Sequence, residues 1–164
     1  MPQSERHLRI RSFDPADLDE ILRLFRDTVR TVNRRDYSAE QVAAWAPDEP
    51  DREAWLARLT QPWTLVAEDG KSGKAAIVGF GRLRPDGHVD LIYVHAGRQR
   101  QGIGKRLLDH LVELARAHGL RQLTVEASIT ARPFFLRQGF ETLAEQRVQC
   151  RGVDFVDFLM GRAV

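Results

Sequence analysis

The stretch of the chain best suited to chemistry is Arg98-Gln99-Arg100-Gln101-Gly102-Ile103-Gly104, between an apolar segment and an amphipathic one. If these segments are a strand and a helix, the turn lies at a helix N-terminus. Backbone N–H groups there lack partners, and the helix dipole adds partial positive charge. Glycine lets a ligand approach the backbone closely, so a phosphate can bind. The turn is therefore a predicted anion site.

Two common phosphate-binding motifs do not match this turn. A P-loop requires Gly-Lys-Ser/Thr, whereas Gly104-Lys105 is followed by Arg106, and no glycine lies five residues before Gly104. The dinucleotide fingerprint requires a third glycine three residues after the second, and that residue is Leu107. A nucleotide-binding module is therefore disfavoured.

The elements that must position the turn follow a continuous α/β pattern. Strands are predicted at 8–13, 63–69, 76–83, 88–94 and 123–128, with GKSG (70–73) as a turn. Helices are predicted after Asp14, across 38–60 with breaks at Pro47 and Pro50, from the glycines to Gly119, and at 131–138. Residues 143–160 form a predicted hairpin that turns near Arg151-Gly152. This order predicts a mixed α/β sheet with helices on both faces.

Length and composition narrow the class of protein. A chain of 164 residues fits one domain, 1–164. Charges of both signs are dispersed with a net charge of +2, which argues against nucleic-acid binding. A lone cysteine excludes an internal disulfide and a cysteine zinc cluster. No run approaches the roughly 18 apolar residues of a membrane span, and the N-terminus lacks a signal-peptide core, so we expect a cytoplasmic protein away from membranes.

Two segments together resemble one known family. Gln99-Arg100-Gln101-Gly102-Ile103-Gly104 fits Gln/Arg-x-x-Gly-x-Gly/Ala after an apolar strand, and it resembles the pyrophosphate turn of the GNAT superfamily of acetyl-CoA-dependent N-acetyltransferases. ARPFFLRQGF (131–140) resembles that family's later Ala-x-x-Phe-Tyr-x-x-x-Gly-Phe segment, 27 residues beyond Gly104. The resemblance is sharp over 88–140 and extends to 1–87 only in the order of elements. It implies a mixed, mostly antiparallel, twisted sheet that is splayed between its middle strands.

The resemblance also implies where acetyl-CoA binds. The pyrophosphate would lie on the N–H groups of the turn, and the pantetheine arm would pair with the splayed strand and pack against two phenylalanines. The implied coenzyme-binding residues are Ile92, Tyr93, Val94, Gln99, Arg100, Gln101, Gly102, Ile103, Gly104, Lys105, Ser128, Phe134 and Phe135. Charge-assisted contacts from Arg100 and Lys105 would strengthen phosphate binding.

Acetyl transfer to an amine needs a proton acceptor and a polarised thioester carbonyl. We assign the carbonyl contact to the backbone N–H of Val94 or a neighbour. Strict alternation places His88, Asp90, Ile92 and Val94 on one face of their strand. The family often has a carboxylate on this strand, and Asp90 lies nearer the splay than His88. Glu126, in an otherwise apolar strand, is a third candidate if burial raises its pKa. Structural roles for Asp90 and Glu126 remain equally open.

The sequence differs from the family at the residue that would protonate the leaving thiolate. The usual tyrosine, which can donate a proton to the sulfur, is replaced by Phe135. A thiol has a reference pKa of about 8.5, so a thiolate leaves tolerably without an acid near neutral pH. Tyr37, Ser128 or a water could substitute, or no general acid is used.

The acceptor wall is expected in 31–50, where this family varies. Asp36, Tyr37 and Trp45 are candidates to line a pocket for a cation with an apolar body. The function predicted is direct transfer of acetyl from acetyl-CoA to a primary amine of a small molecule or peptide, without a metal or a covalent acyl-enzyme. A non-catalytic acyl-CoA-binding or sensing domain on the same fold is the alternative. A homodimer is left open.

Overall fold

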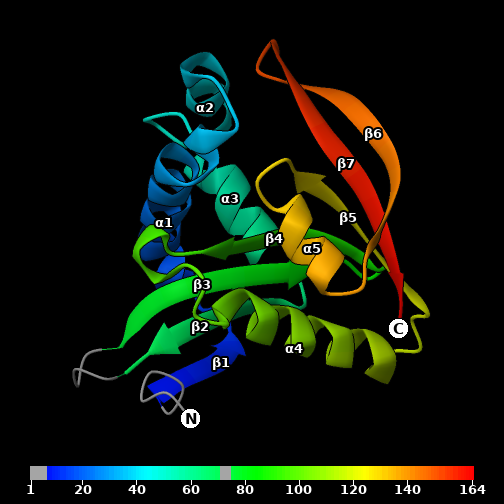
Figure 1. The fold of residues 1–164 in the computed structure, drawn as a ribbon. Helices are drawn as coiled ribbons and strands as arrows, with labels where there is room; N and C mark the ends of the chain where they lie inside the picture. The colour runs from blue at the N-terminus through cyan, green and yellow to red at the C-terminus, as the bar shows by residue number, and fades with distance from the viewer. Residues whose placement is uncertain (1–6, 71–74) are drawn as a thin grey trace.

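A twisted seven-stranded sheet organises the computed structural model, which describes residues 7–70 and 75–164 (Figure 1). The strand order is β1-β2-β3-β4-β5-β7-β6. Neighbouring strands are antiparallel except for β4 and β5, which are parallel. The strands are β1 (Leu8–Ser12), β2 (Thr64–Asp69), β3 (Ala76–Leu83), β4 (His88–Val94), β5 (Gln122–Ser128), β6 (Glu141–Cys150) and β7 (Val153–Ala163). The predicted mixed sheet is confirmed.

Helices cover both faces of the sheet, also as predicted. One apolar cluster joins the sheet to α1 (Leu18–Thr31), α2 (Ala39–Trp45) and α3 (Arg52–Leu59). Two further clusters join it to α4 (Ile103–Ala117) and α5 (Arg132–Arg137) on the other side. Asp14 caps a short 3-10 turn (Pro15–Asp17) that leads into α1, while Ser38 and Asp51 cap α2 and α3. Two helices therefore form in 38–60, where the prolines predicted a break.

Glycines at both ends of α4 and in the turn of the terminal hairpin adopt left-handed backbone conformations. Gly102, at the N-cap of α4, has a φ of 81°, and Gly119, just after the helix, has a φ of 74°. The hairpin between β6 and β7 turns through Arg151 and Gly152, whose φ values are 48° and 78°. Glycine adopts these left-handed conformations without a steric penalty from Cβ.

Strands β4 and β5 are paired only at their beginnings. The two pairs are His88 with Thr124 and Val89 with Val125. Beyond them the sheet opens, and in Figure 1 β6 and β7 stand at a steep angle to β2 and β3. A splay between the middle strands, as the resemblance implied, is therefore present.

A β-bulge at Asp90 interrupts β4 just where the splay begins. The register with β3 pairs Arg82 with Leu91 and Leu83 with Val89, so Asp90 is an extra residue on its strand. A bulge bends the strand and reverses the alternation of side chains beyond it. Asp90 is thereby directed toward α3.

The bulge corrects one expectation from the sequence. Leu91 and Tyr93 pack toward α1–α3, whereas Val89, Ile92 and Val94 pack toward α4. Strict alternation had placed residues 88, 90, 92 and 94 on one face, and this prediction is wrong because it assumed a strand without a bulge.

The carboxylate of Asp90 is held by two arginines. Arg58 on α3 donates from Nε to Oδ2 and from Nη2 to Oδ1, both at 2.8 Å, and Arg82 on β3 donates from Nη1 to Oδ2 at 2.7 Å. The side chains of Asp90 and Arg82 are only 15% and 9% exposed. Burial opposes ionisation of Asp90, but the two guanidinium groups outweigh it and lower the pKa of this carboxyl.

The turn predicted at 70–73 lies largely outside the described residues. Among the helices of residues 7–70 and 75–164, none is long and apolar enough to cross a lipid bilayer.

The hydroxyl of Tyr37 links the segment between α1 and α2 to the far half of the sheet. It donates to the Val156 carbonyl at 3.1 Å and accepts from the Ile129 N–H at 2.8 Å. Burial raises the pKa of Tyr37, so the hydroxyl stays protonated near neutral pH. Both of its hydrogen-bonding roles are thus used inside the fold.

We predict that Tyr37→Phe lowers the free energy of unfolding by about 1–3 kcal/mol, because it leaves two backbone groups without their partner. Denaturant unfolding measures this loss. The turnover number of the folded variant should change little. A loss of about a hundredfold in turnover would instead identify Tyr37 as a general acid.

We also predict that Asp90→Asn destabilises the fold by about 3 kcal/mol at neutral pH, because it leaves the buried Arg82 without a counter-charge. Within the described residues, Arg82 Nε is already a buried atom without a hydrogen-bond partner. The exposed pair of Asp48 with Arg30 offers a control, and Asp48→Asn should leave the free energy of unfolding nearly unchanged.

The pH dependence of the Asp90→Asn effect follows from the lowered pKa of Asp90. Its contribution is complete above the unfolded pKa, about 3.9, and is lost as the pH falls through the lower pKa of the folded state. The stability difference between wild type and Asp90→Asn should therefore shrink below about pH 4. An equal difference at pH 3 and pH 7 would contradict this account.

Candidate active site

A cleft of about 1000 Å³ follows the opening between β4 and β5, and we call it the coenzyme cleft. It extends from the glycine turn along both strands to α5. Of the coenzyme-binding residues implied by the sequence, all except Gln101 line it. The Gln101 side chain instead accepts a hydrogen bond from Arg98 Nε at 2.7 Å. The structure thus brings the two motifs, which are 27 residues apart in the sequence, to one cleft.

The glycine turn forms one end of the coenzyme cleft and presents the N-terminus of α4. Gln99 Nε2 donates to the carbonyls of Val94 and His95, at 2.8 and 3.2 Å, and this fixes the exit of the chain from β4. A Cβ built on Gly104 would lie 3.4 Å from the Phe134 ring and 3.5 Å from Val94, which is ordinary contact. The protein itself would thus accept alanine at 104, so the glycine leaves room at the helix N-terminus for something else.

The basic side chains of the turn differ in whether they already form ion pairs within the protein. Lys105 Nζ forms an ion pair with Asp109 at 2.8 Å, and Arg98 Nη1 forms one with Asp69 at 2.9 Å. Arg100 is exposed, with a φ of 59°, and makes no hydrogen bond or ion pair in the part of the chain that the structure describes. Arg100 is therefore the most available cation for a phosphate oxygen.

Two backbone N–H groups of β4 face the splay. His95 N donates to the Val78 carbonyl on β3 at 2.8 Å. In an antiparallel ladder, alternate residues face the neighbouring strand, so Tyr93 faces β3 whereas Ile92 and Val94 direct their N–H groups away from it. The backbone of β5 pairs with β4 only as far as Val89. These two N–H groups can therefore bind an extended ligand or polarise a carbonyl.

The Val94 carbonyl, in contrast, is already engaged. It accepts from Thr28 Oγ1 at 2.9 Å as well as from Gln99 Nε2. Thr28 therefore ties α1 to the end of β4, a role with no recognisable signal in the sequence.

The three predicted proton acceptors lie in different surroundings. Asp90 is committed to Arg58 and Arg82, and its lowered pKa makes it a weak base. His88 Nδ1 contacts Thr124 Oγ1 at 2.8 Å, within the paired part of β4 and β5. Glu126 is exposed, so the burial expected from its apolar neighbours in the sequence is absent.

Glu126 nevertheless has an accessible position. Its neighbours on β5, Val125 and Ala127, are buried against α4 and α5, so alternation directs Glu126 toward the opposite face of the sheet. It lines the coenzyme cleft on the side where α1–α3 lie. An exposed carboxylate there can take a proton directly or through a water.

The structure places Phe135, which stands where the family has a tyrosine, inside the core. The Phe135 ring is 1% exposed and packs edge-on against Phe134 and Phe140, with centroids 5.1 Å away in each case. Ser128 Oγ accepts from the Ala131 N–H at 3.0 Å and keeps a proton to donate. Burial raises the pKa of Tyr93 to about 12, with the Trp45 indole opposing the shift, so the Tyr93 hydroxyl stays protonated near neutral pH.

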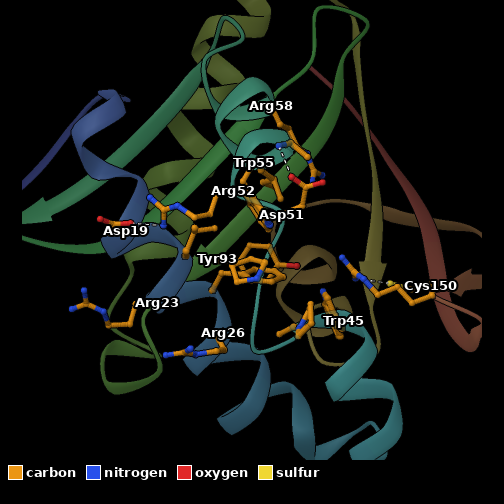
Figure 2. A pocket seen from close by; sticks show the side chains of 18 of the residues that line it. Asp19, Arg23, Arg26, Trp45, Asp51, Arg52, Trp55, Arg58, Tyr93 and Cys150 are labelled. Atoms are coloured by element: carbon orange, nitrogen blue, oxygen red, sulfur yellow. Dashed lines mark hydrogen bonds and ion pairs between the residues drawn. The ribbon is translucent and has the colours of Figure 1, made fainter.

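A second cleft, of about 660 Å³, adjoins the first across Tyr93, and we call it the acceptor cleft (Figure 2). It lies between α1, the segment from α2 to α3, and the tip of the β6–β7 hairpin. The residues that line both clefts are Trp45, Arg58, Asp90, Leu91, Tyr93 and Cys150. A coenzyme in one cleft and an acceptor in the other would thus meet beside β4.

The predicted acceptor residues are divided between the clefts. Trp45 lines both, whereas Asp36 and Tyr37 line only the coenzyme cleft. Asp36 Oδ2 accepts from Thr130 Oγ1 at 2.8 Å. The sequence reasoning missed most of the acceptor cleft, including Arg58, because exposed arginines on short helices carry no distinctive pattern.

Comparisons with known proteins agree with this geometry. The family model for the acetyltransferase (GNAT) domain matches residues 33–161. The uncharacterized N-acetyltransferase YafP of Escherichia coli K12 is 34% identical over 156 residues, covering 94% of this chain and 95% of YafP.

Solved structures of similar proteins share this fold, and one of them contains acetyl-CoA. The GCN5-related N-acetyltransferase of Rhodopseudomonas palustris superposes with a TM-score of 0.89 at 31% identity, covering 95% of each chain. The yncA protein of Salmonella typhimurium, solved with its cofactor acetyl-CoA, has a TM-score of 0.69 at 20% identity, with 95% of this chain and 93% of that one covered. The chain belongs to the GNAT superfamily of N-acetyltransferases.

Proposed function

We propose that the enzyme transfers acetyl from acetyl-CoA directly to a primary amine of a small molecule. One observation carries this proposal: the N–H groups of Ile92 and Val94 face the splay close to where the coenzyme cleft and the acceptor cleft adjoin. An acyl donor that follows β4 and an amine from the other side would meet next to a carbonyl-polarising group.

The coenzyme cleft suits acetyl-CoA as a co-substrate. Its pyrophosphate would lie on the N–H groups at the start of α4, with Arg100 as a counter-charge. Its pantetheine arm carries amides and would pair with Ile92 and Val94 as an added strand. Phe134, whose ring lies 3.4 Å from the position of a Cβ on Gly104, lines the cleft and would pack against this arm.

The reaction requires a neutral amine. An alkylammonium has a pKa of about 10 and no lone pair, so a proton must leave before attack. We assign its removal to Glu126, directly or through a water, since Asp90 is committed to its two arginines. The amine nitrogen then bonds to the thioester carbonyl carbon, and the carbonyl oxygen gains charge beside the Ile92 or Val94 N–H. The carbon–sulfur bond breaks, and the nitrogen, which is positively charged after attack, gives a second proton to water as the neutral amide forms.

The departing sulfur leaves as the CoA thiolate. Because a thiol has a pKa of about 8.5, the thiolate is an adequate leaving group without a general acid. Water, or the Ser128 hydroxyl at the edge of the cleft, can return a proton. The fully buried Phe135 ring takes no part beyond packing.

The test of this function is turnover of acetyl-CoA with a panel of primary amines, followed as thiol release and as acetylated product by mass spectrometry. The proposal predicts equal amounts of CoA and N-acetyl product. Binding of acetyl-CoA without transfer to any amine would contradict it and favour an acyl-CoA-sensing role.

We predict that Gly104→Ala weakens CoA binding by about tenfold or more while the protein stays folded. The new methyl group meets only ordinary contacts from Phe134 and Val94, so a loss of affinity would report crowding of the ligand. Calorimetric titration with CoA measures it. Gly70→Ala, whose Cβ would meet no atom within 4 Å and which lies outside the cleft, is the matched control. Unchanged CoA affinity in Gly104→Ala would remove the glycine turn from the binding site.

We also predict that Glu126→Gln lowers kcat/KM at neutral pH by about a hundredfold and abolishes the acid limb of its pH profile. Partial recovery is expected at high pH, where the amine is already neutral. Asp90→Asn, measured on its folded fraction, should keep the acid limb. The reverse pattern, with the limb lost only in Asp90→Asn, would return the role of base to Asp90.

A further inference from the structure

The acceptor cleft is rich in arginine. Five arginines but three aspartates line it, which leaves an excess of two positive charges. The arginines are Arg23 and Arg26 from α1, Arg52 and Arg58 from α3, and Arg151 from the hairpin tip. This distribution differs from the sequence expectation of a pocket for a cation, which rested on Asp36 and the aromatic residues nearby.

Each aspartate in this lining already has a partner within the protein. Asp90 is bound by Arg58 and Arg82. Asp19 forms an ion pair with Arg52, and Asp51 accepts the Ala54 N–H as the N-cap of α3. An ammonium group entering the cleft would therefore compete with existing contacts for every carboxylate.

Three of the arginines are not neutralised in this way. In the described part of the chain, Arg23 makes no hydrogen bond or ion pair. Arg26 has a 3.8 Å contact with the adjacent Asp27 and a longer-range attraction to the exposed Asp48, with no hydrogen bond to either. Arg151 donates to the Ala44 carbonyl at 2.6 Å instead of to a carboxylate. These guanidinium groups remain available to an anion.

The three available arginines lie in two places in the cleft: Arg23 and Arg26 together on α1, and Arg151 beside Cys150 at the hairpin tip. Arg23 and Arg26 are three residues apart on α1 and therefore lie on neighbouring positions of one helix face. Figure 2 shows Arg23, Arg26 and Arg52 on one side of Tyr93, with Cys150 on the other. Trp45 and Trp55 also line the cleft and supply apolar walls.

We propose that the acceptor is a small amine that also carries a carboxylate, of the amino acid class. Its carboxylate binds the guanidinium groups of Arg23 and Arg26, its apolar part contacts Trp45 and Trp55, and its amine points toward β4 beside Tyr93. This inference rests on the proposed acetyl transfer to an amine. Polyamines and lysine-rich peptides, whose extra charges are positive, are poor substrates in this account.

The test compares three matched acceptors in wild-type enzyme at saturating acetyl-CoA: an L-amino acid, its carboxamide, and the amine that lacks the carboxyl group. The amino acid should have a kcat/KM at least about tenfold above those of the other two, the ratio expected for one charge-assisted hydrogen bond. The amine of the carboxamide loses its proton more easily than the amine of the amino acid. This difference favours the carboxamide and therefore works against the predicted order.

The double variant Arg23→Gln/Arg26→Gln assigns the preference to these residues. We expect it to raise KM for the amino acid by about tenfold or more, with kcat, CoA affinity and KM for the carboxamide little changed. Arg116→Gln, an exposed change on α4 outside both clefts, is the control.

The possible results distinguish a failure of the proposed acceptor class from a failure of the proposed acetyl transfer. If uncharged amines or polyamines are acetylated as efficiently as amino acids, acetyl transfer stands and the anionic acceptor is refuted. An equal loss for all acceptors in the double variant also refutes it. If no amine in any series is acetylated, the proposed transfer itself is refuted, and the acceptor class with it.

Discussion

The site depends on a short parallel pairing between two strands. β4 and β5 share only two residue pairs before they separate, and that separation turns a continuous sheet into a cleft. If β4 were paired along its whole length, the N–H groups of Ile92 and Val94 would bond to a neighbouring strand, as buried backbone groups usually do. The splay leaves them open to a ligand that resembles a strand, while antiparallel pairing with β3 occupies the other edge of β4.

The bulge at Asp90 and its two arginines stabilise this open arrangement. Asp90 is the extra residue of β4, and its carboxylate joins β3 through Arg82 and α3 through Arg58. A buried carboxylate with two guanidinium partners is costly to break, so it holds the strand at the point where the sheet opens. The same contacts lower the pKa of Asp90 and make it unsuited to take a proton. We therefore regard Asp90 as a positioning residue, and Glu126 as the proposed base.

Much of the fold could be predicted from the sequence because local signals were strong. The glycine turn, the apolar face of α4, the break between α2 and α3 and the turn at Arg151-Gly152 each depend on a few neighbouring residues. Tertiary partners leave no such local trace. The bulge directs Asp90 to Arg58, a partner 32 residues away, and the exposure of Glu126 depends on which face of β5 is covered. The acceptor cleft was missed for the same reason, since its arginines come from separate elements.

Residue-resolved amide hydrogen exchange with and without CoA tests the central claim most directly. In the free protein the amides of Tyr93 and His95, which face β3, should be protected, whereas those of Ile92 and Val94 should exchange faster. Saturating CoA should slow exchange at Ile92 and Val94 and at the N-terminus of α4, with little effect on Tyr93 and His95. If CoA binds and leaves the amides of Ile92 and Val94 unchanged, the coenzyme does not lie along the splayed strand and the account is wrong.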